Sequence, residues 1–254
     1  MLQAHSLLWH YLWIAPRILT LTLVAALLRG NFRRRYPIFF SYLIFSTIEG
    51  ICLYVFDVSS RFSPFTWWRA FLVGTIIEGL LKFALIGELV HHLLHPWPSI
   101  AKLGRNLISG AGVVLVLGAS VAAAFAVPDN APRVVGGAHI ISEAIYLTAA
   151  GLIASIFVLA AYFHIPWEST NFGIAVGAGF TWCLHLAVWA LVTGGVVRNQ
   201  VWEDLAMEAA YHVSVLIWCY YLLIPHEVSI QNPTPALPEG SLDLWNRELE
   251  RLLQ

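Results

Sequence analysis

The charged side chains that could do chemistry in this sequence stand inside long apolar stretches. Glu78 and Lys82 are four residues apart within residues 67–94, and Arg17 and Glu49 stand near the middle of two further stretches. An ionised group in hydrocarbon is costly, so such side chains face the interior of a helical bundle and pair with one another. Two interpretations stay open: the four charges are ion pairs that only hold helices together, or they form a proton relay or the floor of a ligand pocket.

A second group combines imidazoles with carboxylates. The spacing of His139 and Glu143, and of Glu208 and His212, is i,i+4, which places each pair on one face of a helix, and His185 stands on the helix between them. Neutral histidine and carboxylate are the usual ligands of a divalent metal with an open coordination position. The sequence therefore offers a metal site as one interpretation and a hydrogen-bonded network without metal as the other.

A third group lies at the end of the stretch that contains Glu78. Glu88, His91, His92 and His95 form the pattern E-x-x-H-H-x-x-H, in which Glu88 and His92, and His91 and His95, are one helical turn apart. Histidine titrates near neutral pH, so this string could bind a metal or act as a pH-sensitive switch. The alternative is a set of interfacial histidines that reach lipid headgroups and water.

The apolar stretches carry more acids than bases. Glu49, Glu78, Glu88, Glu143 and Glu208 outnumber Arg17 and Lys82, and Arg69 at the start of the stretch 67–94 does not restore the balance. Protons, protonated histidines, a bound metal or water must compensate the excess negative charge. This excess predicts a polar interior without choosing its chemistry.

Composition defines the class of protein that has to hold these groups. The chain has 254 residues, of which 59% are hydrophobic and 11% charged, and its mean hydropathy is +0.72. Such a chain is a polytopic membrane protein rather than a soluble domain. A net charge of −1 provides no basic field for DNA or RNA, so no nucleic-acid partner is expected. The three cysteines lie inside apolar runs and indicate no disulfide framework.

Seven stretches are long and apolar enough to cross a bilayer, which needs about 20 residues each. We therefore predict an all-α, seven-transmembrane-helix bundle in residues 1–225. Gly173 and Gly177 form a G-x-x-x-G pattern that would let a neighbouring helix approach closely. The predicted spans are 7–28, 38–56, 67–94, 107–127, 138–163, 172–193 and 205–224.

Lysine and arginine in the connecting segments predict the orientation. Eight of these residues fall on one side and four on the other, with Arg33, Arg34 and Arg35 contributing most of the bias. Because positive charge stays on the cytoplasmic side, we expect the N-terminus outside and the C-terminus in the cytoplasm.

The composition changes after Pro225. Residues 226–254 begin with a polar linker that contains three prolines, and residues 241–253 place Leu242, Trp245, Leu249 and Leu252 on one helical face. The opposite face mixes acids and bases, which favours docking to a protein over binding to anionic lipid. We therefore predict a C-terminal amphipathic helix that could serve a protein partner, while the bundle itself contacts the lipid bilayer.

Three strings carry a resemblance to known proteins: LWIAPR at 12–17, RRRYPIFF at 33–40 and LWNRELERLL at 244–253. In these strings the chain resembles bacterial seven-helix membrane proteins to which no activity is assigned, and the resemblance implies the bacterial inner membrane and a seven-helix topology. The buried acids and histidines are also similar to those of the zinc hydrolases of the alkaline ceramidase and adiponectin-receptor group. However, Glu208 and His212 replace a pair of histidines, so that activity is not carried over. A retinal protein is excluded because residues 205–224 contain no lysine.

Three functions remain as hypotheses. The first is a receptor-like or sensor module that binds a small ligand, or responds to protons, in the outer half of the bundle. The second is a metal-dependent intramembrane hydrolase that uses His139, Glu143, His185, Glu208 and His212. The third is a proton-coupled carrier that uses Glu49, Glu78 and Lys82. The cofactor stays unknown: a divalent metal is one possibility, and a haem-binding electron carrier that uses paired histidines is a fourth alternative.

Overall fold

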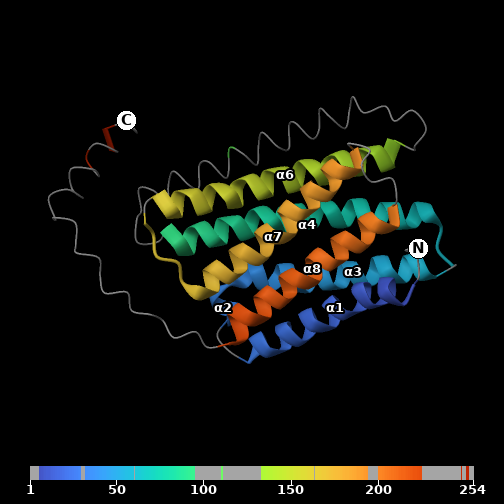
Figure 1. Cartoon of the computed structure of the whole chain (residues 1–254), viewed down its shortest axis with the longest axis horizontal. Helices are drawn as coiled ribbons and strands as arrows, with labels where there is room; N and C mark the ends of the chain where they lie inside the picture. Colours follow the sequence, from blue (N-terminus) through green and yellow to red (C-terminus); the bar gives the residue numbers. More distant parts are fainter. Residues whose placement is uncertain are drawn as a thin grey trace.

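The chain is all-helical in the part that the structure describes. The computed structural model describes residues 6–29, 32–59, 61–94, 133–162, 164–193 and 200–224, together with Gly110, Arg247, Glu250 and Arg251, but not the side chains of residues 64, 65, 133–140, 193 and 200. These residues form seven helices and no strand (Figure 1), namely α1 (Leu7–Leu28), α2 (Phe32–Arg35), α3 (Pro37–Val58), α4 (Pro64–Leu94), α6 (Arg133–Tyr162), α7 (Ser169–Thr193) and α8 (Gln200–Leu223).

Six of these helices, all except α2, are long and apolar enough to cross a membrane. The predicted span 107–127 lies outside the described residues. The same is true of most of the predicted C-terminal helix, of which only Arg247, Glu250 and Arg251 are described, as exposed helical residues.

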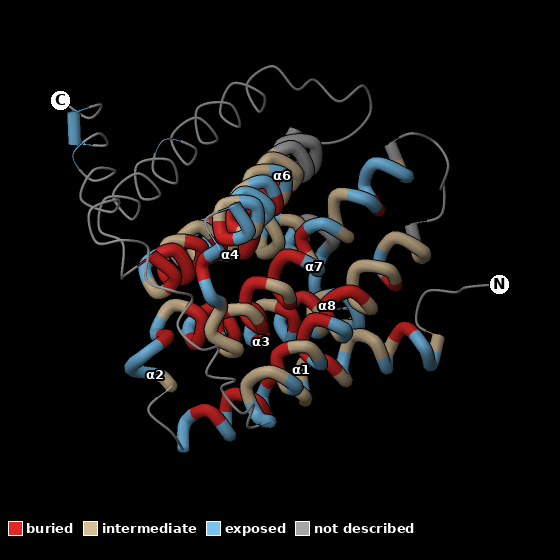
Figure 2. Tube along the Cα trace, turned by 60° about the vertical axis from the view of Figure 1, so that its left-hand side comes forward, coloured by how far each residue is buried: buried red, intermediate tan, exposed pale blue. Residues whose placement is uncertain are grey.

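The exterior of the bundle is apolar. Large side chains such as Leu80, Leu147 and Val158 are 65%, 64% and 67% exposed. Figure 2 shows buried residues on the inner faces of the helices and exposed residues on the outer faces. A soluble protein rarely exposes so much contiguous apolar surface, whereas lipid covers it at no cost. The chain is therefore an integral membrane protein.

The six long helices form a closed ring. In the order α1, α3, α4, α6, α7 and α8 each helix packs against the next, and α8 packs against α1. Helices α4 and α6 run in the same direction, because Gly79 lies against Ile145 and Lys82 lies against Tyr146. Helices α1 and α8 are also parallel, so α1 begins and α8 ends at opposite ends of the bundle (Figure 1).

The two ends of the ring differ in charge. One end, called here the arginine end, carries Arg33, Arg34 and Arg35 on α2. The other end is formed by the start of α1, the turn from α3 to α4, and the starts of α6 and α8. It is called the cavity end, because a large polar cavity is found there.

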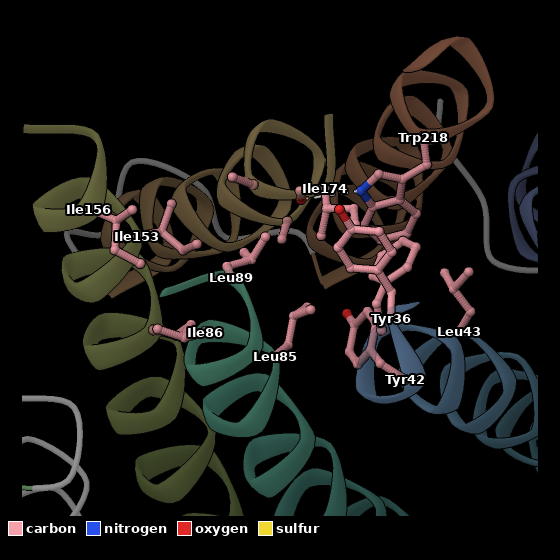
Figure 3. Packing of buried hydrophobic residues seen from close by; sticks show 14 of the residues in the cluster. Tyr36, Tyr42, Leu43, Leu85, Ile86, Leu89, Ile153, Ile156, Ile174 and Trp218 are labelled. Atoms are coloured by element: carbon pink, nitrogen blue, oxygen red, sulfur yellow. Dashed lines mark hydrogen bonds between the residues drawn. The ribbon is translucent and has the colours of Figure 1, made fainter. Parts of the chain in front are cut away.

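An apolar core fills the ring between its middle and the arginine end. Leu43, Leu85, Leu89 and Ile174 are almost fully buried, and Trp218 packs among them. Figure 3 shows side chains from α3, α4, α6, α7 and α8 meeting there. Side chains packed in this way leave few voids larger than a water molecule.

Helices α7 and α8 meet in this region through small residues. A Cβ atom at Gly173 would overlap Tyr221, and one at Gly177 would overlap Trp218. The indole of Trp218 also donates a hydrogen bond of 3.4 Å to the carbonyl of Ile174. The close helix approach predicted from the G-x-x-x-G pattern is thus confirmed, and its partner is α8.

Candidate functional site

A polar cavity occupies the cavity end of the bundle. Its volume is about 690 Å³, and side chains from all six long helices line it. Its walls run from Arg17, Glu78 and Tyr146 near the middle of the bundle to Asp57 and Phe62 at the turn between α3 and α4. A cavity of this size lies within the range of about 300–1,000 Å³ that is typical of small-molecule sites.

One wall contains a continuous chain of polar side chains, called here the α4/α6 chain. Nε2 of His185 lies 3.4 Å from Oε1 of Glu143, and the His185 ring stacks on Tyr146 with centroids 3.5 Å apart. Nζ of Lys82 lies 3.4 Å from the centre of the same Tyr146 ring, so the ring is held between a cation and an imidazole. Lys82, which is only 1% exposed, then donates a 3.1 Å hydrogen bond to Glu78.

The opposite wall contains a second group, called the α1/α8 pair. The guanidinium of Arg17 donates to both carboxylate oxygens of Glu208 at 3.1 and 3.2 Å. Its Cζ atom lies 4.3 Å from the centre of the Tyr211 ring. The hydroxyl of Tyr211 is hydrogen-bonded to Thr20 and accepts a hydrogen bond from Ser46. A buried Arg–carboxylate pair with both oxygens engaged is well compensated, so it connects α1 to α8.

Glu49 of α3 stands between these two groups. Arg17, Glu78 and Lys82 all act electrostatically on its carboxylate, yet Glu49 forms no hydrogen bond or ion pair with another described residue. Glycine makes room for both side chains: a Cβ at Gly74 would overlap the Glu49 carboxylate, and one at Gly50 would overlap the Arg17 guanidinium.

Several buried polar atoms of the lining side chains have no hydrogen-bond partner. They include Oε2 of Glu143, Nε of Arg17 and the indole N–H groups of Trp13 and Trp67. Each unpaired buried polar atom costs about 1–3 kcal/mol unless water or a ligand meets it. The side chains around the cavity therefore carry both acceptors and donors that the described chain leaves unsatisfied.

The lining is acidic and aromatic. Among the described residues it contains seven carboxylates and nine aromatic rings of Trp, Tyr and Phe. The deep carboxylates are Glu49, Glu78, Glu143 and Glu208. The rim carboxylates, at the end of α3 and the start of α8, are Asp57, Glu203 and Asp204.

The structure merges two of the groups that the sequence treats separately. Arg17, Glu49, Glu78 and Lys82 share one cavity region with Glu143, His185 and Glu208. His212 is not among the lining residues, and its ring packs against Tyr11 with centroids 5.8 Å apart. The side chain of His139 lies outside the described residues. Within the described residues, no three His, Cys, Asp or Glu side chains group so as to hold a metal ion.

The third predicted group lies at the arginine end. Glu88 accepts hydrogen bonds from the backbone N–H groups of Ile38 and Phe39 at 3.0 and 2.9 Å, so its carboxylate caps the free amides at the start of α3. His92 forms a 2.9 Å hydrogen bond with the carbonyl of Arg35, while the neighbouring His91 is exposed. His95 lies outside the described residues. These contacts fit a structural role for Glu88 and His92.

Tyr36 forms a further polar contact at the arginine end. Its buried hydroxyl donates a 2.8 Å hydrogen bond to Asn171 of α7, and burial raises the pKa of that hydroxyl, so it remains a donor. Arg35 forms a more exposed 2.6 Å ion pair with Glu168. At the arginine end, Glu88, His92, Tyr36 and Arg35 thus each have a protein partner.

Sequence reasoning missed the tyrosines and the rim of the cavity. Tyr146 stands three residues after Glu143, and Tyr211 stands three residues after Glu208. This spacing places each ring on the same helix face as its carboxylate, and it was the signal available in the sequence. The rim carboxylates lie at helix ends, where acidic residues are ordinary and carry no such signal.

Comparisons with known proteins give no assignment: no family model, no curated protein and no solved structure matches this chain. Any functional conclusion therefore depends on the geometry of the cavity. That geometry is a cavity of small-molecule size, lined by charged and aromatic side chains from six helices.

Proposed function

We propose that this protein is a receptor-like or sensor module of the membrane that binds a small water-soluble ligand in the polar cavity. The observation that supports this most directly is the cavity itself. It combines a ligand-sized volume with buried polar atoms that no described side chain satisfies. Preformed pockets with a few convergent polar groups are the usual sites of small-molecule binding.

The two walls of the cavity connect a bound ligand to several helices, whose movement could produce a response. The α4/α6 chain joins α4, α6 and α7, the α1/α8 pair joins α1 and α8, and Glu49 of α3 stands between them. A ligand that pairs with Glu49 or Glu143 changes the balance of charge in both walls at once. Because a ligand shifts a conformational equilibrium only by its differential affinity, a site that contacts all six helices is well placed to do so.

A seventh crossing and the orientation belong to the same proposal. Helices α4 and α6 run in parallel, so the connecting chain has to return to the cavity end before α6 begins, and we assign that return to the span 107–127. The arginine end then faces the cytoplasm by the positive-inside rule, and the cavity opens outside. The 241–253 helix follows on the cytoplasmic side as the surface for a protein partner.

Cysteine accessibility tests this proposal. The native Cys52, Cys183 and Cys219 are first replaced by serine, and Ser142→Cys and Thr75→Cys are then made separately, since both positions are buried and line the cavity. We expect membrane-impermeant methanethiosulfonates to label both from the outer side of sealed vesicles. The matched control keeps only Cys52, which is exposed on α3 outside the cavity lining and so faces lipid. Labelling from the inner side, or labelling of Cys52 alone, contradicts the proposal.

A second candidate function is a proton-coupled carrier, and one observation favours it. Glu49, Glu78 and Lys82 sit where the cavity ends and the apolar core begins, which is where an alternating-access protein would hold its coupling charges. Proteoliposomes in a proton gradient distinguish the two functions. A proton flux that Glu78→Gln abolishes would identify the protein as a carrier. If the proteoliposomes leak protons no faster than empty liposomes, the receptor-like function remains.

The metal-dependent hydrolase stays a prediction, because the side chain of His139 lies outside the described residues. Of its other candidate ligands, Glu208 is engaged by Arg17, and His212 is not among the lining residues. Elemental analysis of the purified protein tests it: less than about one-tenth of an equivalent of zinc would exclude a resident metal at the affinities typical of such sites.

A further inference from the structure

We infer that the ligand of the polar cavity is an organic cation, an ammonium group attached to an apolar body. This inference rests on the proposed function and adds the chemical class of the ligand. Three independent properties of the lining support it: its charge, its rings and its unpartnered atoms.

The charge of the lining is the first property. Glu78 is paired with Lys82, and Glu208 is paired with Arg17. Glu49 and the rim carboxylates Asp57, Glu203 and Asp204 form no ion pair with any residue in the described part of the chain. Low-dielectric walls that carry one sign of charge concentrate ions of the opposite sign and repel their own. The site therefore attracts cations.

The bases near the cavity do not offset this. Arg17 and Lys82 each already contact a carboxylate and an aromatic ring, so neither is free to receive an anionic ligand group. Arg61 and Arg69 lie at the same end of the bundle but do not line the cavity. An anion entering past the rim would lose its hydration without gaining an unengaged cation.

The aromatic rings are the second property, because they distinguish an organic cation from a metal ion. Two rings of the lining already hold cations of the protein itself: Arg17 lies over Tyr211 and Lys82 lies over Tyr146. Further rings gather at the start of α4, where Trp67 stacks on Phe71 with centroids 5.4 Å apart and an interplanar angle of 6°. Rings of this kind bind ammonium groups and cover apolar ligand surface, whereas a hydrated metal ion gains nothing from most of them.

The unpartnered atoms are the third property, and they point to specific contacts. Oε2 of Glu143 is shielded from solvent and accepts no hydrogen bond, although its other oxygen faces His185. Glu49 stands across the cavity without a partner in the described residues. Both residues line the cavity, so their carboxylates are the acceptors that we assign to the ammonium group. The free indole N–H of Trp67 offers a donor to a polar atom on the body of the ligand.

Equilibrium binding tests the inference with probes of matched shape. Phenethylamine and benzyltrimethylammonium are the cations, phenethyl alcohol is the neutral analogue, and 3-phenylpropionate is the anion. Each is titrated calorimetrically into the full chain in nanodiscs, with empty nanodiscs subtracted. We expect both cations to bind with Kd below about 1 mM, and the neutral and anionic analogues to bind at least about tenfold more weakly.

Two variants locate that binding. Glu49→Gln keeps the shape of the side chain but removes the carboxylate that would pair with the ammonium group, and it should weaken binding of the cations about tenfold, which corresponds to about 1.4 kcal/mol. Glu168→Gln removes a carboxylate at the arginine end and should leave binding unchanged. If Glu49→Gln melts well below the parent chain, Asp204→Asn at the rim replaces it. Equal effects at positions 49 and 168 overturn the inference.

A kinetic measurement gives an independent readout in the Ser142→Cys variant. A methanethiosulfonate that carries trimethylammonium should react faster there than one that carries sulfonate, by at least about tenfold relative to a free thiol in solution. A ratio near that of the free thiol overturns the inference.

The two failures are distinguishable. If Ser142→Cys is labelled from outside but the neutral or anionic probe binds as tightly as the cations, or neither cation binds below about 1 mM, the inference falls and the proposed function stands. If Ser142→Cys is not labelled at all, the cavity is closed to water and both fall.

Discussion

Glu88 and Glu49 are both carboxylates on inward helix faces, but they are at opposite ends of the bundle and in opposite situations. Glu88 is only 7% exposed, and each of its oxygens accepts a backbone N–H from the start of α3. Glu49 forms no hydrogen bond within the described residues, and glycine at position 74 leaves space for it. The residue type is the same; only the completeness of its contacts differs.

The two ends of the bundle differ in the same way. At the arginine end, Tyr36, His92 and Arg35 each have a protein partner, and a dense apolar core begins just beyond them. At the cavity end, polar groups outnumber the partners that the described chain supplies. A buried polar group that is hydrogen-bonded within its own fold stabilises that fold, whereas one without a partner beside a cavity indicates a ligand site.

The largest expected effect comes from breaking the α1/α8 pair. Arg17→Met leaves Glu208 as an uncompensated charge in a largely buried site, which should destabilise the protein by about 3–5 kcal/mol. Arg17→Met combined with Glu208→Met should restore stability to within about 1 kcal/mol of the parent, because the orphaned charge is gone. Unfolding in detergent followed by circular dichroism measures both.

The exposed pair at the other end is the matched control for that double substitution. Arg35 and Glu168 lie closer together, at 2.6 Å, but their side chains are 56% and 38% exposed. Arg35→Met should therefore cost less than about 1 kcal/mol. If Arg35→Met lowers stability as much as Arg17→Met does, burial does not decide the strength of the two ion pairs, and the contrast between the two ends is wrong.

A smaller effect is expected at the two contrasted carboxylates. Glu88→Ala leaves two amides of α3 without acceptors and should lower stability by about 1–3 kcal/mol. Glu49→Gln removes a carboxylate that has no hydrogen-bond partner among the described residues, so it should leave stability unchanged or raise it. Melting temperatures of the two variants in the same detergent decide this, and a larger loss at position 49 than at position 88 would reverse the assignment of the two ends.

Much of the fold was predictable from the sequence. Hydropathy and length predicted an all-helical membrane protein, because a bilayer demands long apolar helices and little else satisfies the backbone there. The small residues at 173 and 177 predicted a close helix contact. Hydropathy does not say which helices are neighbours, so the closure of the ring by α1 and α8 could not be read from it.

The sequence predicted most of the residues that form the site, but it did not predict which of them contact one another. Arg17 was grouped with Glu49 and Glu78 because all three lie at similar depth, yet its partner is Glu208, on a helix almost two hundred residues away. Depth along a helix follows from sequence, whereas the facing helix depends on packing. The same limit kept Glu88 apart from the start of α3, although Pro37 marks that helix start in the sequence.

The smallest expected effect separates two glycines on one helix. Gly87 of α4 has nothing within 4 Å of the place a Cβ would occupy, so Gly87→Ala should raise stability by up to about 1 kcal/mol through helix propensity. In Gly74→Ala the new methyl group meets the Glu49 carboxylate, which must move, so the gain in stability should be lost. Binding of benzyltrimethylammonium should weaken in Gly74→Ala and stay unchanged in Gly87→Ala. Parallel melts and titrations of the two variants measure this. Equal binding in both would mean that the position of Glu49 is not what the cavity uses to hold a cation.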